Sequence, residues 1–317
     1  MIALTLSPFV SYAVIGTLSP DNNMKYKEIF IFMAQFTNQA QLSYNNSIIN
    51  SNVAVGEILE VLSATKTAVM DDYTRNDEVT YVIGIVNSGT TPITGLTVTD
   101  DLGAYAFGTT SLVPLTYVEG SVHLYINGVL QAAPTVNAEG TALVFSGINL
   151  PANSNLLLIY EAEVNQFAPL DVGDSIVNTA TITGTGLPTP VTVSETVTPE
   201  EEPELTITKS IEPTTVTENG TVTYRFIIQN YGNTPAEVDD NVAVTDTFDP
   251  ILSNLSVTFN GETWAEGTQY NYAPATGLFA TVPGQITVPA ATYTQDPDTG
   301  AWVITPGVSV LTVTGTV

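Results

Sequence analysis

Residues 62–103 read LSATKTAVMDDYTRNDEVTYVIGIVNSGTTPITGLTVTDDLG, and residues 205–249 read LTITKSIEPTTVTENGTVTYRFIIQNYGNTPAEVDDNVAVTDTFD. The two stretches share Thr-Lys, a turn, Val-Thr-Tyr, Asn-x-Gly and Val-Thr-Asp, in the same order. The aligned pairs are Lys66 with Lys209, Tyr81 with Tyr224, and Asp100 with Asp246. Such internal similarity is typical of a chain built from tandem copies of one structural unit.

Each copy has the pattern of β-strands. Val79, Tyr81, Ile83 and Ile85 alternate with smaller or polar residues, so their side chains should share one face of a strand. The Asn-x-Gly triplets are turn signals between such runs, and no window shows a sustained helical period. The sequence therefore predicts an all-β protein made of tandem immunoglobulin-like β-sandwich domains.

The repeat also predicts the domain boundaries. The first domain is expected at 58–198, with a hairpin turn at Asn127-Gly128. An acidic, proline-bounded linker follows at 199–204. The second domain, 205–317, ends without a counterpart of IVNTATITGTG (176–186), so it should lack its closing strands.

The missing strands have a counterpart near the start of the chain. Residues 36–46, FTNQAQLSYNN, resemble 176–186, with Asn38 over Asn178 and Ala40 over Ala180. Residues 33–57 are therefore predicted to be donor strands without a domain of their own. Residues 1–32 are interpreted as a leader or a mis-called extension, with Met33 as the expected true start.

Composition limits the function. The 317 residues include 32 acidic and 6 basic side chains, and a net charge of −26 argues against nucleic-acid binding. There is no cysteine, so disulfides, thiol nucleophiles and zinc–thiolate sites are excluded. His123 is the single histidine, and no glycine-rich phosphate loop is present. The chain is therefore predicted not to be an enzyme.

The order of these motifs resembles the "conserved repeat domain" family of bacterial and archaeal surface proteins, over about residues 36–317. This resemblance implies sandwich domains in tandem on a cell surface and no enzymatic activity. The pattern is also similar to the isopeptide-forming domains of Gram-positive pili and adhesins, in which a strand lysine is joined to a strand asparagine beside a buried carboxylate. Lys66, Asp100 and Asn178 stand at matching strand positions, whereas an LPxTG-like sorting signal is not found in this sequence.

Lys66 and Lys209 are the only lysines beyond residue 32, and they occupy the same repeat position. An amide between Lys66 and Asn178 would need a neutral amine, which burial promotes, and a polarised asparagine carbonyl, which a protonated Asp100 supplies. Holding the partners in contact makes the reaction intramolecular. Two alternatives stay open: a Lys66–Asp100 salt bridge without the covalent bond, and an exposed lysine.

These features predict a structural subunit of an extracellular filament, pilus-like or surface-layer assembly. Inserting residues 33–57 into the second domain of the next copy would join subunits head-to-tail, with Asn38 beside Lys209 and Asp246. The partner is therefore a second copy of the chain, together with the cell envelope or a host surface. The alternative is a cell-surface adhesin or stalk module, or a fragment of a longer repeat protein.

No cofactor is expected. Asp296 and Asp298, in DPDTG, have the opening spacing of a calcium loop but lack its later ligands. A hairpin tip is the simpler interpretation of this segment, and calcium is the alternative.

Overall fold

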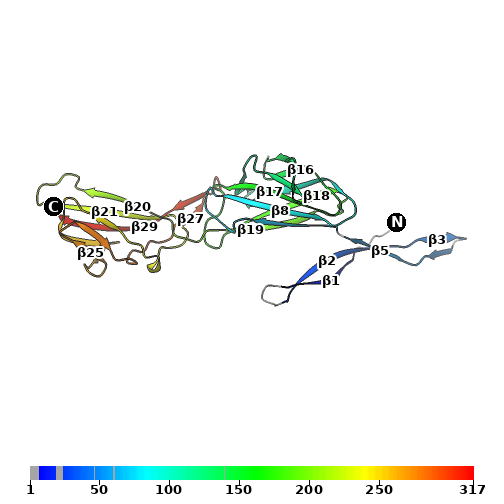
Figure 1. Ribbon diagram of the computed structural model, residues 1–317, viewed down its shortest axis with the longest axis horizontal. Helices are drawn as coiled ribbons and strands as arrows, with labels where there is room; N and C mark the ends of the chain where they lie inside the picture. Colours follow the sequence, from blue (N-terminus) through cyan, green and yellow to red (C-terminus); the bar gives the residue numbers. More distant parts are fainter. Residues whose placement is uncertain (1–6, 19–23, 46, 60, 139) are drawn as a thin grey trace.

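The computed structural model describes the backbone of residues 7–18, 24–45, 47–59, 61–138 and 140–317. Strands dominate these ranges, and the one helical element in them is a single 3-10 turn, η1, at Val238–Asp240. No helix in the same ranges is long and apolar enough to cross a membrane. The molecule is elongated, with the β3 hairpin at one end and the C-terminus at the other (Figure 1). The predicted all-β fold of tandem sandwiches is confirmed.

The first sandwich places two sheets face to face. One sheet has the order β14-β13-β17-β8-β6, with β12 also paired to β17. Its strands are β6 (Leu62–Ala68), β8 (Glu78–Asn87), β12 (Leu115–Tyr117), β13 (His123–Ile126), β14 (Val129–Leu130) and β17 (Ser154–Val164). The predicted turn at Asn127-Gly128 is confirmed: it joins β13 to β14, and both residues have the positive φ that a tight hairpin turn requires.

The opposing sheet has the order β15-β16-β9-β18-β19-β7. Its strands are β7 (Asp72–Tyr73), β9 (Ile93–Asp100), β15 (Thr135–Asn137), β16 (Leu143–Leu150), β18 (Ile176–Thr185) and β19 (Val191–Pro199). A small hairpin, β10 (Tyr105–Phe107) with β11 (Thr110–Leu112), lies outside both sheets. All pairings are antiparallel except the short parallel pair of β7 and β19.

The alternation read from the sequence builds the core between these sheets. Every second residue of β8 is buried, from Val79 through Tyr81 and Ile83 to Ile85. Strand β17 behaves alike, with Leu156, Leu158 and Tyr160 inside. A two-residue side-chain period therefore places one face of each strand in the core and the other in solvent.

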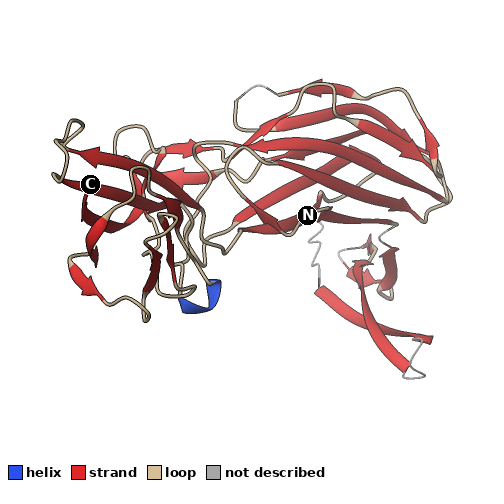
Figure 2. Ribbon diagram, turned by 60° about the vertical axis from the view of Figure 1, so that its left-hand side comes forward, coloured by secondary structure: helices blue, strands red, loops and turns tan. Residues whose placement is uncertain are grey.

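The second sandwich is smaller. Its larger sheet has the order β20-β21-β29-β23-β24, and its smaller sheet has the order β22-β26-β25. The strands are β20 (Leu205–Glu212), β21 (Thr221–Asn230), β22 (Thr245–Thr247), β23 (Ser253–Phe259), β24 (Glu262–Trp264), β25 (Tyr270–Ala273), β26 (Leu278–Thr281) and β29 (Gly307–Thr316). Figure 2 shows η1 on this domain. Phe248 and Phe279 are buried at the centre of its core.

The two domains differ at one sheet edge. In the first, β9 lies between β16 and β18. Its repeat counterpart β22 pairs with β26 alone among the described strands. Among the described strands, none in the second domain corresponds to β18 and β19 of the first.

A hairpin of the second domain anchors it to the first. It consists of β27 (Thr292–Gln295) and β28 (Trp302–Thr305), and its Tyr293 and Ile304 pack against the first domain's core. The backbone nitrogen of Trp302 donates to the Gln166 carbonyl oxygen at 2.9 Å, and the Arg75 guanidinium donates to the Trp302 carbonyl oxygen at 2.9 Å. The junction is thus a packed contact as well as a covalent linker.

The N-terminal strands form two further small sheets. Strands β1 (Ser7–Leu18), β2 (Met24–Asn38) and β5 (Ala54–Leu59) make one, and β3 (Gln41–Tyr44) with β4 (Ser47–Asn50) makes the other. Strand β2 runs through Met33 without interruption, so the expected start there has no structural boundary and stays a prediction. Of the expected extension 1–32, residues 1–6 and 19–23 lie outside the described residues.

The alternation in β17 generates a stability prediction. Leu158→Ala should lower the free energy of unfolding of the first domain by about 2–5 kcal/mol, because Leu158 is fully buried in the core. Leu157→Ala, one residue earlier on the solvent-facing side, should change it by less than about 0.5 kcal/mol. Urea denaturation of both variants is the measurement, and equal losses would contradict the described register.

Candidate functional site

Lys66 lies inside the first sandwich. It follows Leu62 and Ala64 on the inward face of β6, and its side chain is 0% exposed. Its Nζ is 2.7 Å from Oδ2 of Asp100, which is equally buried at the end of β9 in the opposing sheet. The pair therefore bridges the two sheets across the core, and the alternative of an exposed Lys66 is excluded.

Asp100 is held by three donors. Its Oδ2 accepts hydrogen bonds from Lys66 Nζ and from the Tyr160 hydroxyl, each at 2.7 Å. Its Oδ1 accepts the backbone N–H of Leu102 at 3.0 Å. A buried carboxylate with an ion-pair partner and further hydrogen bonds meets the condition for keeping charge in a core.

Asn178 completes the cluster from the neighbouring strand. Strand β18 pairs with β9 so that Ala180 lies opposite Asp100, which places Asn178 two residues along on the same face. Its Nδ2 donates to the Tyr160 hydroxyl at 3.1 Å, and its Oδ1 has no hydrogen-bond partner among the described residues. The structure thus brings together Lys66, Asp100 and Asn178, as the sequence pattern placed them.

Tyr160 is the member of this cluster that the sequence comparison missed. It lies on β17, buried at the centre of the core, and its hydroxyl connects Asp100 to Asn178. Its ring stacks on Tyr81 at a centroid distance of 5.5 Å. Lys66 Nζ lies 4.9 Å from the Tyr81 ring, which adds a cation–π contact.

Burial and neighbouring charges shift the pKa values of the ionisable side chains in this cluster. Burial lowers the pKa of Lys66, and the neighbouring Asp100 carboxylate opposes that shift. Burial raises the pKa of Tyr160 well above its ordinary value, and the Asp100 charge raises it further. The amine is therefore closer to its neutral, nucleophilic form than an exposed lysine, while the phenol stays protonated.

The second sandwich repeats two of these residues in a more open setting. Lys209 pairs with Asp246, but their side chains are 39% and 18% exposed. Lys209 Nζ lies over the rings of Tyr224 at 4.6 Å and Phe248 at 5.4 Å. Within one chain the asparagine is missing: Asn38 is exposed and lies opposite Ala54 in the β2–β5 pair.

The Asp296–Asp298 segment forms a hairpin tip between β27 and β28. Oδ1 of Asp296 accepts the backbone N–H groups of Asp298 and Thr299 and the Thr299 hydroxyl. The Thr299 hydrogen bonds lower the pKa of Asp296. Across the described part of the chain no three His, Cys, Asp or Glu side chains converge on a metal site. Turn capping accounts for Asp296, and calcium binding stays untested.

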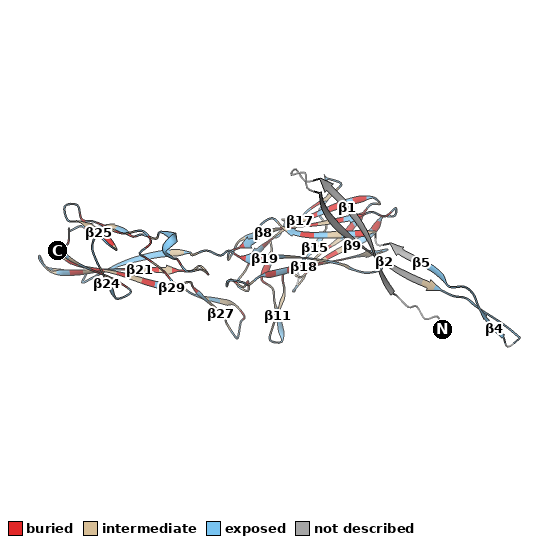
Figure 3. Ribbon diagram, turned by 90° about the horizontal axis from the view of Figure 1, so that it is seen from below, coloured by how far each residue is buried: buried red, intermediate tan, exposed pale blue. Residues whose placement is uncertain are grey.

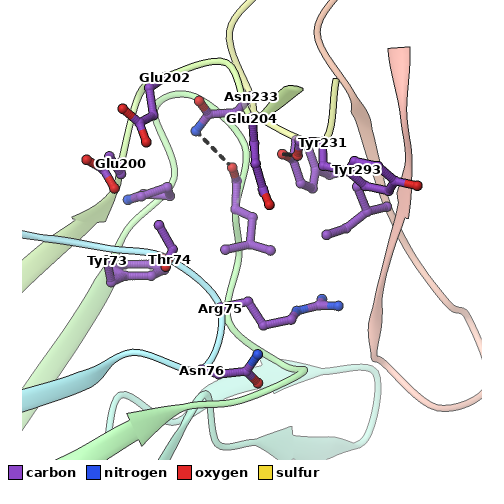
Figure 4. A pocket seen from close by; sticks show the side chains of 14 residues that line it. Tyr73, Thr74, Arg75, Asn76, Glu200, Glu202, Glu204, Tyr231, Asn233 and Tyr293 are labelled. Carbon is purple, nitrogen blue, oxygen red and sulfur yellow. Dashed lines mark hydrogen bonds between the residues drawn. The ribbon is translucent and has the colours of Figure 1, made fainter. Parts of the chain in front are cut away.

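A pocket of about 390 Å³ lies at the junction of the two domains. Figure 4 shows Glu200 and Glu202 on one side of it and Tyr231 and Tyr293 on the other, with Arg75 between. Glu202 raises the pKa of Glu200 by charge repulsion. None of the lysine, aspartate and asparagine residues discussed above lines this pocket, so we attribute it to the packing of the junction.

Comparison with known proteins gave structural matches only. No protein-family profile matches the chain, and neither does any curated protein sequence. The major pilin subunit BcpA of Bacillus cereus aligns at 12% identity over 97% of this chain and 95% of its own, with a TM-score of 0.34. The full-length major pilin SpaD of Corynebacterium diphtheriae aligns at 10% identity over 90% and 72%, with a TM-score of 0.34.

A family 123 glycoside hydrolase of Clostridium perfringens also matches, at 10% identity over 44% of this chain and 28% of its own, with a TM-score of 0.28. Scores at this level carry no argument about function. The resemblance to the conserved repeat domain family therefore stays an interpretation of motif order, and the functional conclusion rests on the residues themselves.

The lowered pKa of Lys66 predicts a pH dependence. Asn178→Ala removes the amide partner and leaves the ion pair. Between the folded pKa and the ordinary value of 10.5, the unfolded chain binds the proton that folded Lys66 has released. The stability of this variant should therefore rise with pH across that window, by linkage.

Urea midpoints measured at several pH values test this. The control is Lys66→Met combined with Asn178→Ala, which lacks the titrating amine and should lack this component of the rise. A stability of Asn178→Ala that falls with increasing pH, relative to that of the double variant, would contradict the assigned direction.

Proposed function

We propose that the chain is a structural, non-enzymatic subunit of an extracellular filament. Subunits join head-to-tail by donor-strand addition, and Lys–Asn amide bonds strengthen the assembly. The observation that carries the proposal is the open edge of β22 in the second domain, together with a strand pair of matching pattern at the other end of the same chain.

Near this open edge, apolar residues of β20 are exposed to solvent. Strand β6 buries alternate residues, but its counterpart β20 is exposed along almost its whole length, including Ile207 and Ile211. The difference follows from the missing neighbours, since β19 packs against β6 in the first domain. An unpaired edge with apolar residues beside it is a site for strand addition.

The N-terminal hairpin carries the complementary surface. Four apolar side chains of β3 and β4 are each half exposed or more: Leu42, Tyr44, Ile48 and Ile49. Figure 3 shows β4 coloured as exposed. Burying a side chain of this kind contributes about 1.5–3 kcal/mol. An exposed apolar strand pair and an open apolar groove in one sequence therefore favour association.

The strands of the N-terminal segment pair antiparallel with each other, as β18 and β19 do in the first domain, but in two separate pieces and with a different register. In the first domain, Ile182 lies opposite Val191 and Ile176 opposite Val197. In the N-terminal segment, Leu42 lies opposite Ile49 and Phe36 opposite Gly56. The sequence alignment places 36–46 on 176–186, and the described strands of this donor segment are already paired within the N-terminal region.

The positions of the donor strands and of the open edge favour a contact between two molecules. The β3 hairpin lies at one end of the molecule and the second domain at the other, with the first domain between them (Figure 1). A contact between opposite ends is heterologous, so it repeats from copy to copy and extends a fibre. In that arrangement Asn38 takes the position beside Lys209 and Asp246 that Asn178 takes beside Lys66 and Asp100.

The amide reaction balances without a co-reactant. Lys66 passes a proton to Asp100 and attacks Cγ of Asn178 with the freed electron pair. The new Nζ–Cγ bond forms, the Cγ–Nδ2 bond breaks, and ammonia leaves with one of the two protons that the amine gives up, while the other stays on Asp100. The held geometry makes the step intramolecular, which offsets the low reactivity of an amide.

The first test is the intact mass of the purified chain. Closure of the Lys66–Asn178 bond should lower the mass by one ammonia, and Asp100→Ala should keep the full mass. That variant should also lose about 2–5 kcal/mol of stability, the range typical of a lost cross-link. Glu195→Gln, beside Asn178 on β19, is the control and should still react. A wild-type mass equal to that of the unmodified sequence would falsify the intramolecular amide.

The second test separates assembly from covalent linkage. At high concentration the wild type should form filaments visible by electron microscopy and a ladder on a denaturing gel after boiling. Lys209→Ala and Asn38→Ala should each abolish the ladder, and Asn50→Ala, on the exposed hairpin, should not. Deletion of 33–57 should abolish the filaments themselves. Filaments from the deletion variant would rule out donor-strand assembly.

A further inference from the structure

The Tyr160 hydroxyl occupies the only hydrogen-bonded route that the described residues show between Asp100 and Asn178. It donates to Oδ2 of Asp100 at 2.7 Å and accepts from Nδ2 of Asn178 at 3.1 Å. We infer that Tyr160 is a catalytic residue of amide formation, which relays a proton from Asp100 to the leaving nitrogen of Asn178. The inference rests on the proposed Lys66–Asn178 amide and assigns a role that neither the repeat nor the lysine, aspartate and asparagine pattern contains.

The reaction needs such a relay because of where the protons start and end. Lys66 delivers its proton to Oδ2 of Asp100, with which its Nζ is in contact. The nitrogen that must leave as ammonia is Nδ2 of Asn178, and no direct hydrogen bond joins it to Asp100 in the described structure. An amide nitrogen leaves only after it has been protonated, so the proton must cross this gap.

The relay moves two protons and leaves Tyr160 unchanged. As the Cγ–Nδ2 bond breaks, the Tyr160 O–H proton passes to Nδ2 and the Asp100 proton passes to the Tyr160 oxygen. Nζ, now bonded to Cγ, gives up its extra proton to Asp100. The products are the Lys66–Asn178 amide, ammonia, the regenerated phenol and a protonated, neutral Asp100, so atoms and charge balance.

The surroundings of Tyr160 suit this role. Its ring is fixed between Tyr81, at a centroid distance of 5.5 Å, and Phe145, at 5.3 Å. Burial and the Asp100 charge raise its pKa, so the hydroxyl stays protonated and available as a donor. A rigid phenol shared between an acid and a leaving group is aligned before the reaction begins.

The second domain lacks this relay. Tyr160 lies opposite Tyr81 in the β17–β8 pair, and the residue opposite Tyr224 in the equivalent β29–β21 pair is Val313. Lys209 and Asp246 therefore have no phenol between them and an incoming Asn38. The bond between subunits should form more slowly than the bond within the first domain.

The test is the rate of ammonia loss in full-length chains. Chains made by cell-free synthesis are sampled over time and their intact masses recorded. Tyr160→Phe, which keeps the ring and removes the hydroxyl, should react about 10²-fold more slowly than wild type. Tyr117→Phe is the matched control: it removes the hydroxyl of another tyrosine that packs on Phe145, at a centroid distance of 6.3 Å, but that lies on β12 outside the cluster, and it should react at the wild-type rate.

The possible outcomes separate the amide bond from the proton relay. A wild type that never loses ammonia overturns the amide and the relay together. A wild type that reacts, with Tyr160→Phe reacting equally fast, overturns the relay alone. If near-ultraviolet circular dichroism shows that Tyr160→Phe does not fold, the wild-type rate in mixtures of H2O and D2O decides. Transfer of two protons predicts a curved dependence on the deuterium fraction, and a linear dependence contradicts the relay.

Discussion

The ion pair of Lys66 and Asp100 is the interaction on which the first domain depends. A lysine and an aspartate without solvent contact face each other across the core of a sandwich that contains no disulfide. Removing such charges from water is costly, and the cost is offset only by close contact and by further hydrogen bonds. Both sheets must be present and in register to supply these contacts: β6 brings the amine, β9 the carboxylate, β17 the phenol and β18 the amide.

In the second domain the corresponding ion pair, Lys209–Asp246, has no counterpart of β18 and β19 beside it among the described strands. Lys209 keeps its aspartate and the rings beneath it, but the cluster is open to solvent. The two sandwiches thus differ, among other features, in the presence of a closing strand pair. In the proposed assembly this local difference matters because a segment with a similar sequence pattern, paired only with other N-terminal strands among the described residues, lies at the opposite end of the chain. Under the proposed donor-strand assembly, burial of the Lys209–Asp246 pair and growth of the fibre would be a single event.

Aligning the two internal repeats predicts those features of the site that occur in both copies. The strand alternation around Tyr81, the paired lysines and the alignment of Asn38 with Asn178 can all be recognised in the sequence, because each pattern appears twice. Tyr160 was not visible, because its counterpart Val313 shares neither size nor chemistry and the alignment gives no reason to single it out. The β27–β28 hairpin was missed for another reason: its packing on the first domain joins residues far apart in the chain, such as Trp302 and Gln166, and no local pattern encodes that contact.

A cryo-electron microscopy reconstruction of the assembled protein tests the central claim most directly. Donor-strand assembly predicts that residues 36–57 of one subunit lie as a strand pair beside β22 of the next, with Asn38 against Lys209 and Asp246. The β20 side chains that are exposed in the single chain would then be covered. Filaments whose subunits meet through any other surface, with the β22 edge still unpaired, would contradict it.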